Sequence, residues 1–151
     1  MSERGRIGGA VRQAVAAHKA ARSWSIDVPK GWEHDAEDTL DTFFDPDGVG
    51  ALQISSLTKS GGDVTDGELL ESIEDMKLAD RPRTATAIGQ FTGYALEKVH
   101  DDGQAGRYWF LRAGPMLLFV TYFCDKQDVG KEARLVAKAL GSLRVLPASN
   151  A

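Results

Sequence analysis

The stretch from Arg107 to Cys124, RYWFLRAGPMLLFVTYFC, constrains the fold most, because it is the densest run of aromatic and branched apolar residues in the chain. It predicts two strands joined by a tight turn at Ala113-Gly114-Pro115. A Gly-Pro pair breaks a helix, and aromatic and branched side chains favour strands. Arg112 and the turn also interrupt the run before it reaches the ~20 apolar residues that a membrane-spanning helix needs.

The second strand of this pair is apolar on both faces. Side chains alternate across a strand, so a strand with one wet face would carry polar residues at every second position. Here one face holds Met116, Leu118, Val120 and Tyr122, and the other holds Leu117, Phe119, Thr121 and Phe123. We therefore expect this strand at the centre of a sheet that is covered on both sides, with Phe119 in the core.

Four further strands are predicted from local pattern, at Trp24–Val28, Thr39–Phe44, Ala51–Leu57 and Thr84–Val99. A turn at Asp45-Pro46-Asp47-Gly48 joins the second and third of these into a hairpin. The polar segment Glu33–Asp38 is expected to be a loop. Gly89 and Gly93 lie inside the last strand, where glycine indicates a bulge or a close backbone approach.

Two helices are predicted. The first has Thr65 as its N-cap and Glu68 at capping-box spacing, and it extends to about Ala79. The second covers Val129–Leu140, with Asp128 as N-cap and Gly141 as terminator. The order hairpin, helix, three-stranded meander, helix predicts an α+β fold in which an antiparallel sheet is sandwiched between helices.

We expect one α+β domain over residues 23–147, preceded by a basic tail or short helix at 1–22 and followed by a frayed end at 148–151. The 151 residues carry a net charge of -4, and the tail holds five basic residues and one acidic one. The remainder has 13 basic and 21 acidic residues. An acidic body disfavours nucleic acid, whose binding requires phosphate neutralisation, and favours a basic protein partner.

Cysteine usage and the N-terminal sequence bear on the compartment. The single cysteine, Cys124, excludes an internal disulfide and a cysteine-rich metal cage, and it is compatible with a reducing compartment. The first 23 residues lack the continuous apolar core of a secretory signal. We expect a cytoplasmic location and no membrane partner, although a secreted chain whose signal had been removed would look the same.

Several pieces of the chain resemble the PsbP-like superfamily. They are SIDVPKGW at 25–32, FFDPDGVGALQIS at 43–55, Phe91–Tyr94, Tyr108–Phe110, Thr121-Tyr122 and Leu140–Arg144, which together span about residues 24–146. The resemblance implies an α-β-α sandwich that usually works by binding other proteins, and bacterial members include chaperones for secreted effectors. The family has no shared catalytic motif, so the resemblance assigns no functional residues.

No catalytic, cofactor or metal site is predicted. The histidines lack metal-ligand spacing and are expected at the surface, in the tail and in polar loops: His18, His34 and His100. Cys124 is expected to be a buried, inert thiol. Asp45 and Asp47 resemble the start of an EF-hand loop, but Pro46 and the missing glutamate at its twelfth position argue for a plain turn. Gly48-Val49-Gly50 lacks the third glycine of a dinucleotide fingerprint.

The first helix carries the most acidic surface. Its candidate protein-binding face consists of Asp66, Glu68, Glu71, Glu74 and Asp75, for which a merely solvated helix face is the alternative. Trp24 and Trp32 are expected in the core. We therefore expect a non-enzymatic, protein-binding domain without a cofactor, such as a chaperone or adaptor for a secreted effector. The alternatives are an immunity protein that blocks a basic toxin and, ranked lower, a small-ligand carrier or enzyme using a pocket between helix and sheet.

Overall fold

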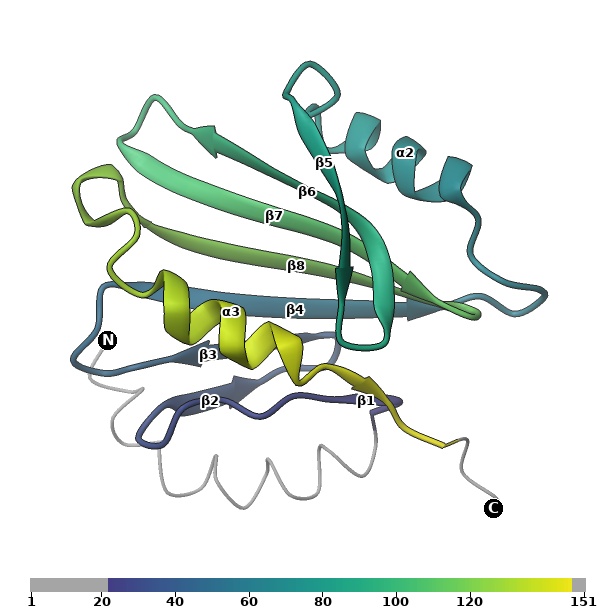
Figure 1. Ribbon diagram of the computed structural model, residues 1–151, viewed down its shortest axis with the longest axis horizontal. Helices are drawn as coiled ribbons and strands as arrows, with labels where there is room; N and C mark the ends of the chain where they lie inside the picture. The colour runs from purple at the N-terminus through teal and green to yellow at the C-terminus, as the bar shows by residue number, and fades with distance from the viewer. Residues whose placement is uncertain (1–21, 148–151) are drawn as a thin grey trace.

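A computed structural model describes residues 22–147 of the chain (Figure 1). Except for Arg22, the predicted basic tail lies outside the described residues, as does the predicted frayed end at 148–151. The fold is a mixed α+β fold built on one seven-stranded antiparallel sheet. In spatial order its strands are β2 (Glu33–Ala36), β3 (Leu40–Phe44), β4 (Gly50–Thr58), β8 (Met116–Asp125), β7 (Gln104–Ala113), β6 (Phe91–Val99) and β5 (Arg83–Ile88).

The other elements lie against this sheet. Two α-helices are described, α2 (Asp66–Asp75) and α3 (Ala133–Gly141). A short 3-10 turn, η1 (Lys126–Asp128), comes between β8 and α3. Near the ends of the described chain, β1 (Trp24–Ser25) pairs antiparallel with β9 (Arg144–Val145) as a separate two-stranded sheet.

The predicted central strands are confirmed. β8 is the fourth of the seven strands and pairs with β4 on one side and β7 on the other. β7 and β8 are joined by the two-residue turn Gly114-Pro115, in which Gly114 has a φ of 56°, a conformation that glycine adopts without steric cost. The run that dominates the sequence is therefore the middle of the sheet.

The two helices cover opposite faces of the sheet (Figure 1). On one face α3 contributes Val136, Ala139 and Leu140 to a core cluster that includes Leu118, Val120, Trp24 and Trp32. On the other face Leu69 and Ile73 of α2 pack with strand residues, namely Leu96, Tyr108 and Phe110. Both tryptophans are buried, as predicted.

The cover on the α2 face is incomplete, because this helix lies against β6 and β7 rather than across the sheet. Leu118 and Val120, which face α3, are fully buried, but Phe119 on the α2 face is only half-buried. Leu57, which is paired with Leu117 at the far end of β4, is 67% exposed. Phe119, predicted in the core, packs against the core cluster on the α2 face but is only partly buried.

The segment predicted as the loop Glu33–Asp38 contains strand β2, and His34 is buried rather than at the surface. Its Nε2 lies 2.7 Å from Asp41 Oδ1, and its ring stacks on Phe43 at a centroid distance of 4.3 Å. Arg22 Nε lies 3.1 Å from the other oxygen of Asp41. This buried polar cluster could not be read from spacing, because its members come from separate segments.

The predicted single strand Thr84–Val99 is a hairpin of β5 and β6, so the meander has four strands instead of three. Gly89-Gln90 forms its two-residue turn, with Gly89 at a φ of 57°. Gly93 is the predicted close approach, because a Cβ there would collide with the Phe110 carbonyl oxygen in β7. That contact excludes any larger residue without a shift of the β7 backbone.

One helix start was predicted correctly and the other was not. Thr65 and Glu68 form the capping box of α2, which ends at Asp75 rather than near Ala79. α3 starts at Ala133 with Glu132 as N-cap, four residues later than predicted from Val129, and Asp128 instead pairs with Lys131. Within residues 22–147, no helix combines the length and apolar character needed to cross a bilayer.

Adjacent residues of β8 give a test of the unequal cover. Leu118→Ala should lower the free energy of unfolding by about 2–5 kcal/mol, because it leaves a cavity in the closed core. Phe119→Ala should cost clearly less, since part of that side chain remains in water. Urea unfolding of the two variants measures both values, and equal losses would contradict the difference between the faces.

Candidate functional site

The predicted acidic face is divided by the structure into internal and free carboxylates. Asp66 Oδ1 accepts a 2.7 Å hydrogen bond from the Tyr94 hydroxyl of β6. Glu68 accepts a 2.8 Å bond from Lys59 Nζ and also closes the capping box with Thr65. The bond from Lys59, followed by that from Thr65, holds the pKa of Glu68 below its usual range. Asp66 and Glu68 are therefore structural acids.

The other three acids of this face, Glu71, Glu74 and Asp75, are exposed. Their side-chain carboxylates form no hydrogen bond or ion pair with the described residues, although the Glu74 backbone carbonyl accepts one from the Lys77 N–H. Three uncompensated carboxylates on one helix surface create a local negative potential. Met76, 47% exposed, lies at the C-terminal end of the same helix. The surface formed by Glu71, Glu74 and Asp75 can attract a cationic group but holds no acid–base pair.

α2 lies over β6 and β7, and the segment after it leads directly into the edge strand β5. Tyr94 links the elements, because its hydroxyl bonds to Asp66 of α2 while the guanidinium of Arg83 from β5 lies 5.4 Å from its ring centroid. The hydrogen bond to Asp66 raises the pKa of Tyr94 above its usual value. Figure 1 shows α2 next to the β5–β6 end of the sheet.

β5 is an edge strand with an open backbone edge. Within residues 22–147 no strand pairs with its outer side. Its sequence, RTATAI, has no proline or lysine, and four of its six residues are exposed. Natural edge strands usually carry proline or lysine, which hinder pairing with another chain, or they are very short. The opposite edge strand, β2, fits that rule better, with four residues that include Glu33 and Asp35. The β5 edge is the more available one.

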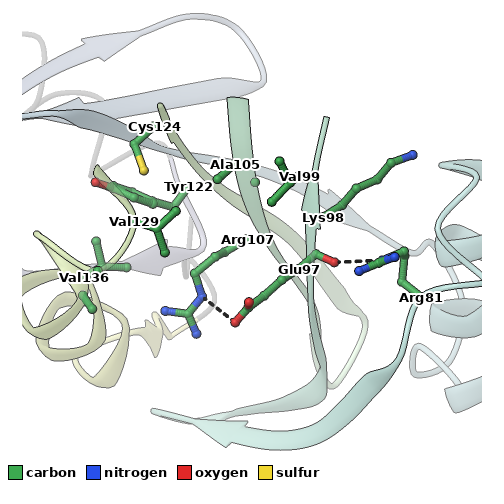
Figure 2. Close-up of a pocket in the computed structure, with 13 residues that line it drawn as sticks. Arg81, Glu97, Lys98, Val99, Ala105, Arg107, Tyr122, Cys124, Val129 and Val136 are labelled. Atoms are coloured by element: carbon green, nitrogen blue, oxygen red, sulfur yellow. Dashed lines mark hydrogen bonds and ion pairs between the residues drawn. The ribbon is translucent and has the colours of Figure 1, made fainter. Parts of the chain in front are cut away.

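A cleft lies on the face of the sheet that α3 covers, between the start of α3 and strands β6 to β8 (Figure 2). This cleft has a volume of about 380 Å³. Its walls are mostly apolar and include Val99, Ala105, Val129, Ala133 and Val136. The volume falls in the lower part of the range of small-ligand sites.

Charged groups lie at one side of the cleft. Arg107 Nε is 3.8 Å from Glu97 Oε2, and Arg81 Nε donates a 3.1 Å hydrogen bond to the Glu97 carbonyl oxygen (Figure 2). The guanidinium of Arg107 also lies 4.9 Å from the centroid of Trp109. This cation–π contact fixes the position of the arginine on the sheet.

The inner wall of the cleft contains Tyr122 and Cys124. The Tyr122 hydroxyl donates a 2.6 Å hydrogen bond to Glu132 Oε1, and both residues are buried. Burial and this bond raise the pKa of Tyr122. Burial, followed by the Asp128 charge, raises the pKa of the Cys124 thiol. Both groups are therefore protonated at neutral pH and are poor nucleophiles there.

The remaining chemical candidates have structural partners. His34 bonds to Asp41, and His100 Nε2 lies 2.7 Å from the Tyr108 hydroxyl. His18 lies outside the described residues. The Asp45–Gly48 turn is a plain turn in which the Gly48 N–H bonds to the Asp45 carbonyl. In the part of the chain that the structure describes, no group of three or more His, Cys, Asp or Glu side chains could hold a metal ion.

The sequence identified the acidic helix and allowed a pocket between helix and sheet as an alternative, but it did not predict the β5 edge or the residues that line the cleft. The Gly89-Gln90 pair was the available signal for the hairpin that makes β5 a separate strand. The residues that line the cleft had no local signal, because they come from separate segments: β6, β7, β8, the loop before α3, α3 itself and Arg81 before β5.

Comparisons with known proteins support the fold alone. No protein-family model matches the chain, and no curated protein matches it. A solved structure from Bacteroides thetaiotaomicron aligns with a TM-score of 0.62 and 15% identity, covering 83% of this chain but only 46% of that one. LpqN, a protein involved in cell envelope biogenesis of Mycobacterium tuberculosis, aligns with a TM-score of 0.55 and 13% identity, covering 82% of this chain and 83% of LpqN.

The raised pKa of Cys124 predicts low thiol reactivity. A raised pKa reduces the thiolate fraction at any pH below it, and the thiolate is the reacting form. Folded chain should therefore react with a disulfide reagent at pH 8 much more slowly than chain unfolded in urea, and its rate should rise at higher pH. Cys124 is the sole cysteine, so thiol release reports on it directly. Equal rates in the two states would contradict its burial.

Proposed function

We propose that this chain is a non-enzymatic domain that binds another protein through an extended, basic segment of that partner. The observation that carries the proposal is the open β5 edge lying beside the acidic surface of α2. A backbone edge supplies affinity for any extended segment, and side-chain charge then selects among segments. We also propose that the protein is cytoplasmic and that it uses no cofactor.

The edge provides outward-pointing backbone groups at alternate residues. In an antiparallel hairpin with a two-residue turn, the residues next to the turn form a hydrogen-bonded pair, here Ile88 with Phe91. Thr86 and Thr84 then also bond inward to β6. Ala85 and Ala87 direct their N–H and C=O groups away from the sheet, where a partner strand can pair with them.

The charge on α2 supports a basic partner. Glu71, Glu74 and Asp75 lack partners among residues 22–147, and no basic residue occurs within the helix. Arg83, the one charged residue of β5, is stacked on Tyr94, whose hydroxyl bonds to Asp66. Lysine or arginine side chains of an incoming strand would meet the unpaired acids, which mainly speeds association and improves selectivity.

We also propose that the chain is a PsbP-like domain. Its antiparallel sheet with a helix on each face supports this assignment. In that setting the domain would act as a chaperone or adaptor for a secreted effector. An immunity protein that neutralises a basic toxin would use the same surface. Co-expression separates the two roles, because an immunity protein restores growth of cells that make the toxin, whereas a chaperone raises the soluble yield of its effector.

An edge substitution tests the backbone part of the proposal. The ¹⁵N-labelled chain is titrated with a decapeptide of alternating lysine and valine, and amide shifts should concentrate on β5. Ala85→Pro removes the outward N–H without touching a bond to β6, so it should weaken binding about tenfold or more. Ala85→Val keeps the N–H and is the matched control.

The result would oppose the proposal if the shifts avoided β5, or if the proline and valine variants bound equally well. Unchanged thermal unfolding of both variants is the check that β5 remains in the sheet.

A charge substitution tests the selectivity. The double variant Glu71→Lys, Asp75→Lys should bind the lysine peptide several-fold more weakly and should prefer an otherwise identical glutamate peptide. The loss should shrink as salt is raised, because exposed charges are screened. Anisotropy titrations at two salt concentrations measure this. If the variant binds the lysine peptide as before, the acidic face is solvated and not part of the binding surface.

A further inference from the structure

The cleft between α3 and the sheet exposes apolar surface that the fold itself does not use. Val99 on β6 is 59% exposed and Val129, in the loop before α3, is 58% exposed, and both line the cleft. They account for two of the six large hydrophobic side chains found exposed in the described chain. Two such side chains around one cavity mark a site for an apolar group.

The cleft exists because small residues line it where the helix begins. Ala105 on β7, with Gly130 and Ala133 around the start of α3, leave space that larger side chains would fill. One turn further on, Val136, Ala139 and Leu140 close the gap by packing into the core. The cavity therefore has a closed, apolar inner end under α3 and an open mouth near β6.

The inner wall offers no free hydroxyl donor to a carboxylate. The Tyr122 hydroxyl donates its hydrogen bond to Glu132, and the Cys124 thiol is buried. A ligand carboxylate placed there would lose its water without gaining a strong donor, which is costly. The inner end of the cleft thus selects a hydrocarbon tail.

The mouth offers a cation. Arg107 Nε is buried and makes no hydrogen bond with the described residues, although Glu97 lies 3.8 Å away. The Glu97 side chain is 73% exposed, so this ion pair is weak. Arg81 is a second guanidinium among the lining residues, on the other side of Glu97 from Arg107 (Figure 2). A ligand carboxylate can bond to Arg107 by two parallel N–H donors, which is the strong geometry for this pair.

From this arrangement we infer that the cleft binds a free, linear monocarboxylate with a medium-length hydrocarbon tail. The carboxylate pairs with Arg107 at the mouth, and the tail lies between Val99, Val129 and Val136. This site is on the opposite side of the β5–β6 hairpin from the outward edge and does not depend on the proposed protein-binding function.

Calorimetric titration with hexanoate, octanoate and decanoate tests the inference. Affinity should rise about threefold to fourfold for each added methylene until the cleft is filled. Decan-1-ol should bind at least tenfold more weakly than decanoate, because it lacks the charge. Decyltrimethylammonium, with the same tail and the opposite charge, should bind more weakly still.

Two variants locate the site. Arg107→Gln should reduce decanoate binding to the level of decan-1-ol while leaving decan-1-ol unchanged. Ala133→Phe fills the cleft and should remove binding of both, and Val129→Asp, at an exposed position, serves the same purpose if the phenylalanine variant fails to fold. Ala85→Pro is the control that should bind decanoate normally.

The inference is overturned if decanoate does not bind, if Arg107→Gln leaves its affinity unchanged, or if binding survives both changes to the apolar wall. Vesicles of anionic phospholipid test the alternative that the cleft recognises the anionic headgroup and hydrocarbon chains of a membrane. If they pellet the chain in an Arg107-dependent way while monomeric decanoate does not bind, the site recognises a membrane surface and the inference is wrong.

Discussion

The whole arrangement depends on burying the central strand β8 on both faces. Its alternating residues are apolar in both directions, so neither face can be left to water. On one face α3 and the buried residues near both ends of the described chain close a core in which Leu118 and Val120 have no exposure. On the other face the shorter cover of α2 leaves Phe119 half-buried. The fold satisfies the constraint unequally, and the two surfaces that we propose for binding lie beside α2 and at the start of α3.

Local signals predicted the parts of the fold that depend on neighbouring residues. The central strand pair, its Gly114-Pro115 turn and the Thr65–Glu68 capping box follow from short-range chemistry. β2 was missed because its sequence, EHDA, is polar and becomes a strand only when His34 meets Asp41. The start of α3 was misplaced because Asp128 bonds to Lys131 instead of capping the helix. Those outcomes are decided by contacts that a single sequence does not display.

The same distinction applies to the candidate site. Periodicity correctly grouped the acids of α2 on a helix, but it could not separate structural from free carboxylates. Asp66 and Glu68 are bonded to Tyr94, which is in β6, and to Lys59, which directly follows β4. The cleft draws its walls from several separate segments, α3 among them, and none of its small residues, such as Ala133, is unusual in sequence. Residues that only the fold brings together show no spacing pattern in the sequence. Their residue types are then the one remaining signal, and alanine and valine are too common to be informative.

The β5–β6 hairpin connects the two surfaces and also keeps them apart. Strand alternation directs Glu97 and Val99 of β6 toward the cleft, while Tyr94 and Leu96 face α2. The edge groups of Ala85 and Ala87 lie in the plane of the sheet and point to neither face. A partner strand added to β5 can therefore extend the sheet without covering Arg107. Arg81 bonds to the Glu97 carbonyl, which ties the segment before β5 to β6 beside the mouth of the cleft.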